Sequence, residues 1–199
     1  MEKKYSLADG KELLELARKS IEYSLASGAG LRETTDKKRF LDKRGCFVTL
    51  NTFPEKELRG CIGFPYPVKP LWNAVIEAAA QAAFNDPRFP RVKASELEKI
   101  VLELSVLTVP QEIKAQKSAI LDEIQVGEDG LIVSKGSHSG LLLPQVAKEY
   151  SWNTETFLKQ CCVKAGLPEA SWQMSDCKIF KFQAQIFSEK EPGGEVEEH

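Results

Sequence analysis

The sequence predicts an α+β fold, with a mainly antiparallel or mixed sheet flanked by helices. Helical and strand patterns are interspersed along the chain, and most of the strands come in pairs around short turns instead of in strand–helix–strand units. The composition supports this class, because 42% hydrophobic and 28% charged side chains in 199 residues are typical of a globular protein with one sizeable core.

The first predicted element is a helix. Apolar residues recur at helical spacing from Leu13 to Leu25, and Gly28 can end the helix. Asp9 is the expected N-cap, because Glu12 follows three residues later as in a capping box.

A β-hairpin is expected next, because residues 45–50 and 58–63 form two runs typical of strands on either side of a turn. The two-residue period of a strand places Arg59 and Cys61 on one face. A helix of small apolar residues follows over 71–85 and ends at Asp86-Pro87. The next strand, 101–107, carries Glu103 on a face that we expect to meet water or a site.

The second half of the chain predicts two strands, 130–134 and 140–143, and then two helices that begin at Pro144 and Thr154. The last strand is expected over 179–187. Residues 1–188 are therefore taken as a single domain with two subdomains, and 189–199 as an acidic disordered tail.

Charge and cysteine content exclude several classes of protein. The net charge is −2 and the basic residues form only short clusters, so nucleic-acid binding is not expected. The sequence has no apolar run long enough for a membrane span and no signal peptide, which predicts a cytosolic protein with no membrane partner. Five cysteines without a C-x-x-C pair, and two distant histidines, predict reduced thiols, no metal site and no cofactor.

The most unusual local pattern is Arg59-Gly60-Cys61-Ile62-Gly63. Glycine within a strand often marks a place where a ligand or another backbone approaches closely. A neighbouring guanidinium favours the thiolate form of a cysteine, so Cys61 is a candidate nucleophile and Arg59 a candidate anion ligand. The alternative is that Cys61 is a small buried thiol that only packs between the two glycines.

Asp86-Pro87-Arg88 is the second candidate. Asp86 and Arg88 could satisfy each other at the end of the helix, or the turn could direct Arg88 toward a ligand. Glu103 is either an acid–base group or the ion-pair partner of an arginine such as Arg59 or Arg88. The ion pair is the favoured interpretation.

Taken together, these segments resemble the AMMECR family. The hexapeptide from Leu58 to Gly63, Leu-Arg-Gly-Cys-Ile-Gly, is identical to the signature of that family. Further family motifs follow in the family's order: Gly45–Thr49 before the signature, and Asp86–Phe89, Ser105–Thr108, Leu143–Val146, Trp152 and Lys164–Leu167 after it. The similarity runs from Ala8 to Glu189.

The resemblance implies a larger and a smaller subdomain with a cleft between them near the signature, but it implies no established reaction. Prokaryotic members are associated with a Memo-type protein and a radical SAM protein, which are therefore the implied protein partners. The family pattern provides no histidine to pair with Cys61, which argues against a cysteine-protease mechanism.

Two functional hypotheses follow. The first is an enzyme or small-ligand-binding protein that recognises an anionic small molecule, in which Cys61 and Glu103 are the catalytic candidates. Its ligand-binding candidates are Arg59, Gly60, Gly63, Asp86 and Arg88. The second is a non-catalytic adaptor that binds a pathway protein and whose signature only builds the fold. RNA binding is the least favoured hypothesis.

Overall fold

The computed structural model describes residues 5–199, with the side chains of residues 117 and 118 left out of the description. The chain divides into two compact units. The larger unit comprises the described residues up to Leu107 together with Gln185–His199, and the smaller unit comprises Thr108–Ala184. Each unit has its own sheet and its own core, and helices flank both sheets, which confirms the predicted α+β class.

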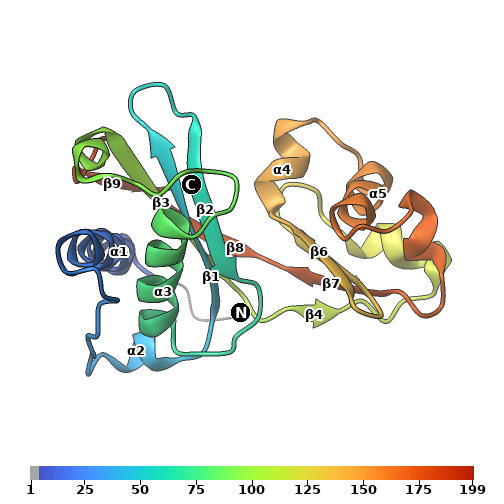
Figure 1. Cartoon of the computed structure of the whole chain (residues 1–199). Helices are drawn as coiled ribbons and strands as arrows, with labels where there is room; N and C mark the ends of the chain where they lie inside the picture. Colours follow the sequence, from blue (N-terminus) through green and yellow to red (C-terminus); the bar gives the residue numbers. More distant parts are fainter. Residues whose placement is uncertain (1–4) are drawn as a thin grey trace. The chain divides into compact units, whose positions relative to one another are not determined.

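The larger unit contains a five-stranded sheet in the order β2-β1-β3-β8-β9 (Figure 1). Its strands are β1 (Gly45–Thr52), β2 (Leu58–Phe64), β3 (Ile100–Leu107), β8 (Ala184–Glu189) and β9 (Val196–Glu198). Its helices are α1 (Leu7–Ser27), α2 (Lys38–Leu41), α3 (Leu71–Phe84) and the short 3-10 helix η1 (Ala94–Lys99). The predicted hairpin is present, because β1 and β2 pair antiparallel.

Helix α1 begins one turn earlier than the sequence pattern predicts. Ser6 is the N-cap, and its side chain accepts a hydrogen bond from the backbone N–H of Asp9. The carboxylate of Asp9 in turn accepts from the backbone N–H of Ser6 at 3.0 Å, which completes a capping box. Asp9 is therefore the third residue of the helix and not its N-cap, and the expectation of a cap at Asp9 was wrong.

The core of the larger unit lies between the sheet and helices α1 and α3. Val48, Leu50, Leu102 and Leu104 alternate along β1 and β3 and are fully buried on this face. Helix α3 meets the sheet with a stripe of buried alanines, which allows its backbone to come close to β2. This packing leaves the other face of β1, β2 and β3 uncovered by these two helices.

The smaller unit contains a four-stranded sheet in the order β4-β7-β5-β6. Its strands are β4 (Gln111–Glu112), β5 (Gly130–Lys135), β6 (His138–Leu142) and β7 (Lys178–Phe182). Its helices are η2 (Lys117–Glu123), α4 (Pro144–Glu149), α5 (Thr154–Lys164) and η3 (Glu169–Gln173). Cys161, Cys162 and Cys177 are buried in its core, and helix α5 supplies the first two of them.

The single strand predicted over 179–187 is in fact two strands in two different sheets. Strand β7 pairs with β5 in the smaller unit, and β8 belongs to the sheet of the larger unit. The break falls at Gln183, whose backbone N–H and C=O both bond to Thr108. Ile179 of β7 belongs to the core of the smaller unit, whereas Phe187 of β8 belongs to the core of the larger unit.

The acidic end of the chain is ordered, in contrast to the disordered tail that the sequence predicts. Residues 190–195 form a turn in which Gly193 adopts a left-handed conformation (φ 67°), and β9 then pairs antiparallel with β8. The carboxylate of Glu189 is buried and binds Arg18 at 2.9 Å and the backbone N–H of Leu102 at 2.9 Å. This buried ion pair with α1 fixes the start of the segment.

No helix in the described part of the chain is both long enough and apolar enough to cross a lipid bilayer.

Candidate functional site

Three polar side chains lie in a row across the sheet of the larger unit. The register pairs Cys61 on β2 with Thr49 on β1, and Thr49 with Glu103 on β3. Directly paired residues point to the same face of a sheet, and this is the face opposite the one that α1 and α3 cover. All three side chains are half-buried. We call Cys61, Thr49 and Glu103 the polar row.

Thr49 was not among the residues singled out from the sequence. Its hydroxyl donates to the sulfur of Cys61 at 3.3 Å. The signal that could have found it is the hairpin register, because Thr49 and Cys61 become direct partners once the two strands are aligned. The strand bounds alone do not give this alignment, because the register shifts between Leu50 and Asn51.

The thiol of Cys61 is not activated by its surroundings. Burial raises its pKa above the ordinary value, and the hydrogen bond from Thr49 and the charge of Arg88 only partly oppose that effect. The sequence-based expectation that an adjacent arginine would favour the thiolate therefore lacks support from the geometry. Cys61 nevertheless differs from the other four cysteines of the described chain, all of which are buried.

Asp86 and Arg88 form one structure at the outer edge of β2. Asp86 Oδ2 accepts a hydrogen bond from the backbone N–H of Cys61 at 2.9 Å, and Arg88 Nη2 donates to the carbonyl of Cys61 at 3.3 Å. The two side chains also bind each other at 2.7 Å and 3.0 Å. Since β2 is an edge strand, this pair satisfies the backbone groups that a further strand would otherwise bind. We call it the edge clamp.

The two members of the edge clamp differ in exposure. The side chain of Asp86 is 1% exposed, whereas that of Arg88 is 51% exposed. The hydrogen bond from Arg88 holds the pKa of Asp86 well below its usual range, so this carboxyl is ionised at neutral pH. Asp86 and Arg88 thus satisfy each other, as the first interpretation of the Asp-Pro-Arg turn holds. That the turn directs the half-exposed Arg88 toward a ligand stays a prediction.

Arg59 does not join the polar row. The register of β1 and β2 shifts between Leu50 and Asn51, so Arg59 falls at an irregularity in the ladder and the strict alternation expected from the sequence fails there. Its guanidinium binds Glu96 of η1 through Nε at 2.9 Å and Nη2 at 3.3 Å. The structure therefore brings Arg88, and not Arg59, next to Cys61.

Gly60 and Gly63 are explained by close backbone packing. A Cβ at Gly60 would lie 2.3 Å from the carbonyl oxygen of Ala82 in α3, and one at Gly63 would lie 2.2 Å from that of Cys46. Real Cβ atoms do not approach other atoms this closely, so a side chain at either position would force the backbone to move. Of the two possibilities that a strand glycine indicates, a ligand or another backbone segment, these two glycines are explained by the backbone of the protein itself.

Glu103 lies two strands away from Cys61, and its negative charge is one of the smaller causes that raise the pKa of the Cys61 thiol. The two residues sit on strands that are separated by β1, and two interstrand spacings amount to about 9.5 Å. Arg59 pairs with Glu96 and Arg88 pairs with Asp86, and the pairing of Glu103 with one of these arginines stays a prediction.

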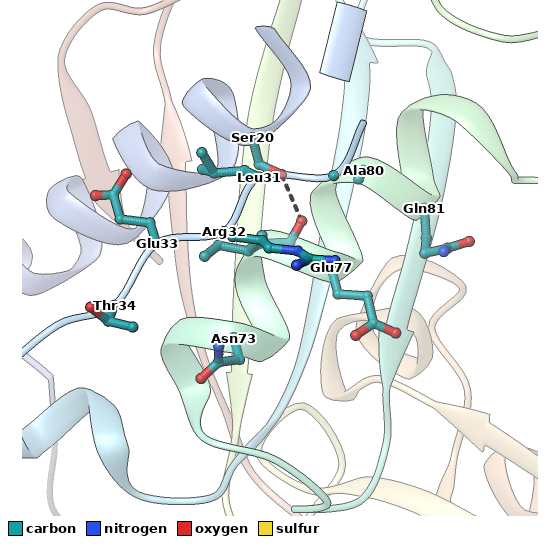
Figure 2. Close-up of a pocket in the computed structure, with 11 residues that line it drawn as sticks. Ser20, Leu31, Arg32, Glu33, Thr34, Asn73, Glu77, Ala80 and Gln81 are labelled. Atoms are coloured by element: carbon teal, nitrogen blue, oxygen red, sulfur yellow. Dashed lines mark hydrogen bonds between the residues drawn. The ribbon is translucent and has the colours of Figure 1, made fainter. Parts of the chain in front are cut away.

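The larger unit also has surface hollows outside the polar row. One of about 440 Å³ lies between α1, residues 30–34 and α3, and Figure 2 shows Arg32, Asn73 and Gln81 around it. None of the predicted site residues lines it. A second hollow of about 650 Å³ lies between the β1–β2 turn and η1, and Arg59 is one of its lining residues.

Within residues 5–199, no group of three or more histidine, cysteine, aspartate or glutamate side chains comes together in a way that could hold a metal ion.

Two antiparallel sheets flanked by helices, with the Arg-Gly-Cys-Ile-Gly strand at one edge, define the class of protein to which this chain belongs. The sequence model of the AMMECR1 family matches residues 14–187, and the chain belongs to that family. The resemblance noted in the signature and the motifs around it is therefore confirmed.

Similar proteins occur in archaea. Protein MK0488 of Methanopyrus kandleri is 48% identical over 200 residues, covering 100% of this chain and 97% of that protein. Protein MJ0810 of Methanocaldococcus jannaschii is 48% identical over 192 residues, which cover 96% of this chain and 95% of that protein. The crystal structure of the uncharacterized protein PH0010 from Pyrococcus horikoshii superposes with a TM-score of 0.90 at 46% identity and covers 96% of each chain.

Proposed function

We propose that the protein binds a small anionic molecule on the polar row, with Arg88 holding the acidic group of the ligand. The observation that carries the proposal is the row itself. Three neighbouring strands place a thiol, a hydroxyl and a carboxylate side by side on a sheet face that α1 and α3 do not cover. A dry core would not contain these three groups in line, because burying polar side chains is costly.

The row sets the length and the polarity of the ligand. Arg88 offers a half-exposed guanidinium beside Cys61, and two of its nitrogens are fixed by Asp86 and by the backbone of β2. At the other end, the carboxylate of Glu103 belongs to a strand whose backbone lies about 9.5 Å from that of β2. A matching ligand carries an acidic group near Arg88 and a hydrogen-bond donor near Glu103, as amino acids and their derivatives do.

Cys61 is a contact residue in this proposal and not an activated nucleophile. Its pKa is raised, chiefly by burial, so the thiolate that acts as a nucleophile is disfavoured. A reaction on the bound molecule would have to use another group, so the proposal commits to binding and to no specific chemical step.

Selective alkylation provides the first test. Iodoacetamide should label Cys61 of the native protein before the four buried cysteines, as read by peptide mass spectrometry. The labelling rate should still rise with pH above the ordinary thiol pKa of about 8.5, because burial keeps the thiol protonated. A rate that levels off below pH 7 would show an activated thiolate and would overturn the assignment of Cys61 as a simple contact.

Binding is tested with a defined panel of glutamate, glutamine, succinate and inorganic phosphate. Ligand-observed NMR should detect binding of a compound with both an acid and a donor. The signal should weaken in Glu103→Gln and in protein alkylated at Cys61. Glu112→Gln, an exposed change in the smaller unit, is the matched control and should have no effect. The proposal fails if no compound binds, or if binding is insensitive to both changes in the row.

A second candidate function, that of an adaptor for a Memo-type or radical SAM protein, has one observation in its favour. Arg59, Gly60, Gly63 and the backbone of Cys61 all have partners within the larger unit, so the signature can be explained by the fold alone. An adaptor would still bind its partner protein after Cys61→Ser and Glu103→Gln. Loss of partner binding in these folded variants would instead favour the ligand site.

A further inference from the structure

The hollow between α1, residues 30–34 and α3 contains no residue of the polar row. It measures about 440 Å³, which is within the range of about 300–1,000 Å³ that is usual for ligand pockets. The apolar part of its lining consists of Leu31, Ile76 and Ala80, and Figure 2 shows the polar side chains around them. All of these residues belong to the larger unit.

The segment that carries Arg32 is anchored to both helices. The carbonyl of Glu33 accepts a hydrogen bond from the indole N–H of Trp72 in α3 at 3.2 Å, and the carboxylate of Glu33 binds Lys19 of α1. Leu31, on the other side of Arg32, packs against the core of the larger unit. Because both neighbours are held, the backbone of Arg32 has a defined position, and Figure 2 shows its side chain extending in the direction of α3.

Arg32 is the charged side chain of this lining that has no partner in the described part of the chain. The lining also contains two carboxylates, but Glu33 binds Lys19 and Glu77 binds Lys69, so both are neutralised by lysines from outside the lining. Arg32 is exposed, so a ligand in the hollow can reach it. The uncompensated charge of the hollow is therefore positive, and it attracts a carboxylate.

Two side-chain amides of α3 line the same hollow. Asn73 and Gln81 are eight residues apart, which is about 12 Å along a helix. Neither amide has a hydrogen-bond partner among the described residues, although each can both donate and accept. An extended peptide rises about 3.3 Å per residue, so about 12 Å corresponds to three or four residues. The two amides can therefore bind the backbone N–H and C=O groups of an extended segment of that length.

We propose that this hollow binds a short acidic segment of a partner protein in an extended conformation. Arg32 binds the carboxylate of an aspartate or glutamate side chain, and Asn73 and Gln81 bind the backbone on either side of that residue. In Figure 2 the end of the Arg32 side chain lies between these two amides. The small side chain of Ala80 leaves room for the segment against α3. The site is separate from the polar row, because no side chain of the row lines it.

The test is an NMR titration of the intact protein, labelled with nitrogen-15, with the peptide Ala-Ala-Glu-Ala-Ala blocked at both ends. Binding should shift the backbone signals of residues 30–34 and 73–81. The same peptide with glutamine in place of glutamate should bind about threefold to tenfold more weakly, and Arg32→Gln should cause a loss of the same size, since an exposed ion pair contributes only modestly. Ala80→Phe fills the hollow with its ring and should abolish binding.

Lys38→Gln is the matched control. Lys38 is an exposed cation of α2 outside the lining, so its variant loses the same charge as Arg32→Gln but should bind like the native protein. The proposal is overturned if the peptide produces no localised shifts, if Lys38→Gln weakens binding as much as Arg32→Gln, or if folded Ala80→Phe still binds. Equal binding of acetate would show a site for small anions instead. Shifts at these residues that depend on protein concentration without peptide would assign the hollow to a second copy, which also contradicts the proposal.

Discussion

Two ion pairs secure β2, and they are built in opposite ways. In the pair Arg59–Glu96 the arginine is the buried member, at 12% exposure against 33% for the glutamate. In the pair Asp86–Arg88 the aspartate is the buried member, at 1% against 51% for the arginine. The accessible charge is therefore negative, from Glu96, at one end of β2 and positive, from Arg88, at the centre of the strand.

The exposed member of each pair is the charge that a ligand can contact. The buried member sets the cost in stability when the pair is broken. A charge left buried without its partner is expensive, whereas one left in water is not. Replacing the exposed member should consequently destabilise the protein more than replacing the buried member, in both pairs.

The largest effect is expected for Arg88→Met. It leaves the carboxylate of Asp86 buried without its ion-pair partner, and we expect a loss of about 3–5 kcal/mol in the free energy of unfolding at pH 7. Asp86→Asn leaves Arg88 hydrated and should cost less. Urea unfolding of both variants measures the difference, and a larger loss in Asp86→Asn would contradict the comparison.

A somewhat smaller effect, about 3 kcal/mol, is expected for Glu96→Ala, because it leaves the guanidinium of Arg59 buried without a carboxylate. Arg59→Met removes the buried charge and leaves Glu96 a third exposed, so its cost should be about 1 kcal/mol. If the two variants unfold at the same urea concentration, the burial of Arg59 has no energetic consequence.

Gly60→Ala tests whether the position of β2 depends on α3 as well as on the two pairs. The new Cβ would meet the carbonyl oxygen of Ala82 at 2.3 Å, and the backbone cannot yield cheaply, so we expect a loss of about 2–3 kcal/mol. Gly30→Ala is the control, since nothing lies within 4 Å of its added Cβ and its stability should be nearly unchanged. Thermal unfolding of both variants decides the matter.

The edge clamp should also make stability depend on pH. The pKa of Asp86 is depressed in the folded protein, so its contribution is present above the unfolded value of about 3.9 and is lost as the pH falls below it. Native protein should therefore lose stability in acid more steeply than Arg88→Met. Urea titrations at several pH values would show the two curves converging, and parallel curves would count against the clamp.

The smallest effect is expected for Cys61→Ala, which removes the acceptor of the Thr49 hydroxyl and should cost about 1 kcal/mol. Thr49→Val removes the same hydrogen bond from the other side. A double-mutant cycle would show whether the two costs overlap, as expected for a single shared interaction. Full additivity would mean that this contact contributes nothing to stability.

The sequence predicted the fold class and the hairpin because these depend on local patterns. The alternation in β1 and the glycines and prolines that end elements are visible along the chain. The change of sheet at Gln183 was not predictable, because an almost continuous apolar alternation conceals it and only the hydrogen bonds to Thr108 reveal it. The order of the acidic end depends on a partner far away in the sequence, Arg18, and was missed for the same reason.

The candidate site was predicted in part. The sequence pointed to Cys61, Asp86, Arg88 and Glu103, and the structure places all four in the larger unit, with Asp86 and Arg88 in contact with Cys61. The sequence could not show which arginine lies beside the thiol of Cys61, because the register shift after Leu50 depends on the conformation of the turn. The partner of Arg59 was equally hidden, because Glu96 follows a helix and a loop.

The buried Glu189 has a consequence for the synthesis of the protein. Its carboxylate joins α1 and β3, so the larger unit needs the beginning, the middle and the end of the chain before its sheet is complete. The smaller unit is one continuous segment, Thr108–Ala184, and needs nothing from the last residues. We therefore expect the smaller unit to be able to fold while the ribosome is still translating, and the larger unit to complete its sheet only after β8 and β9 have been synthesised.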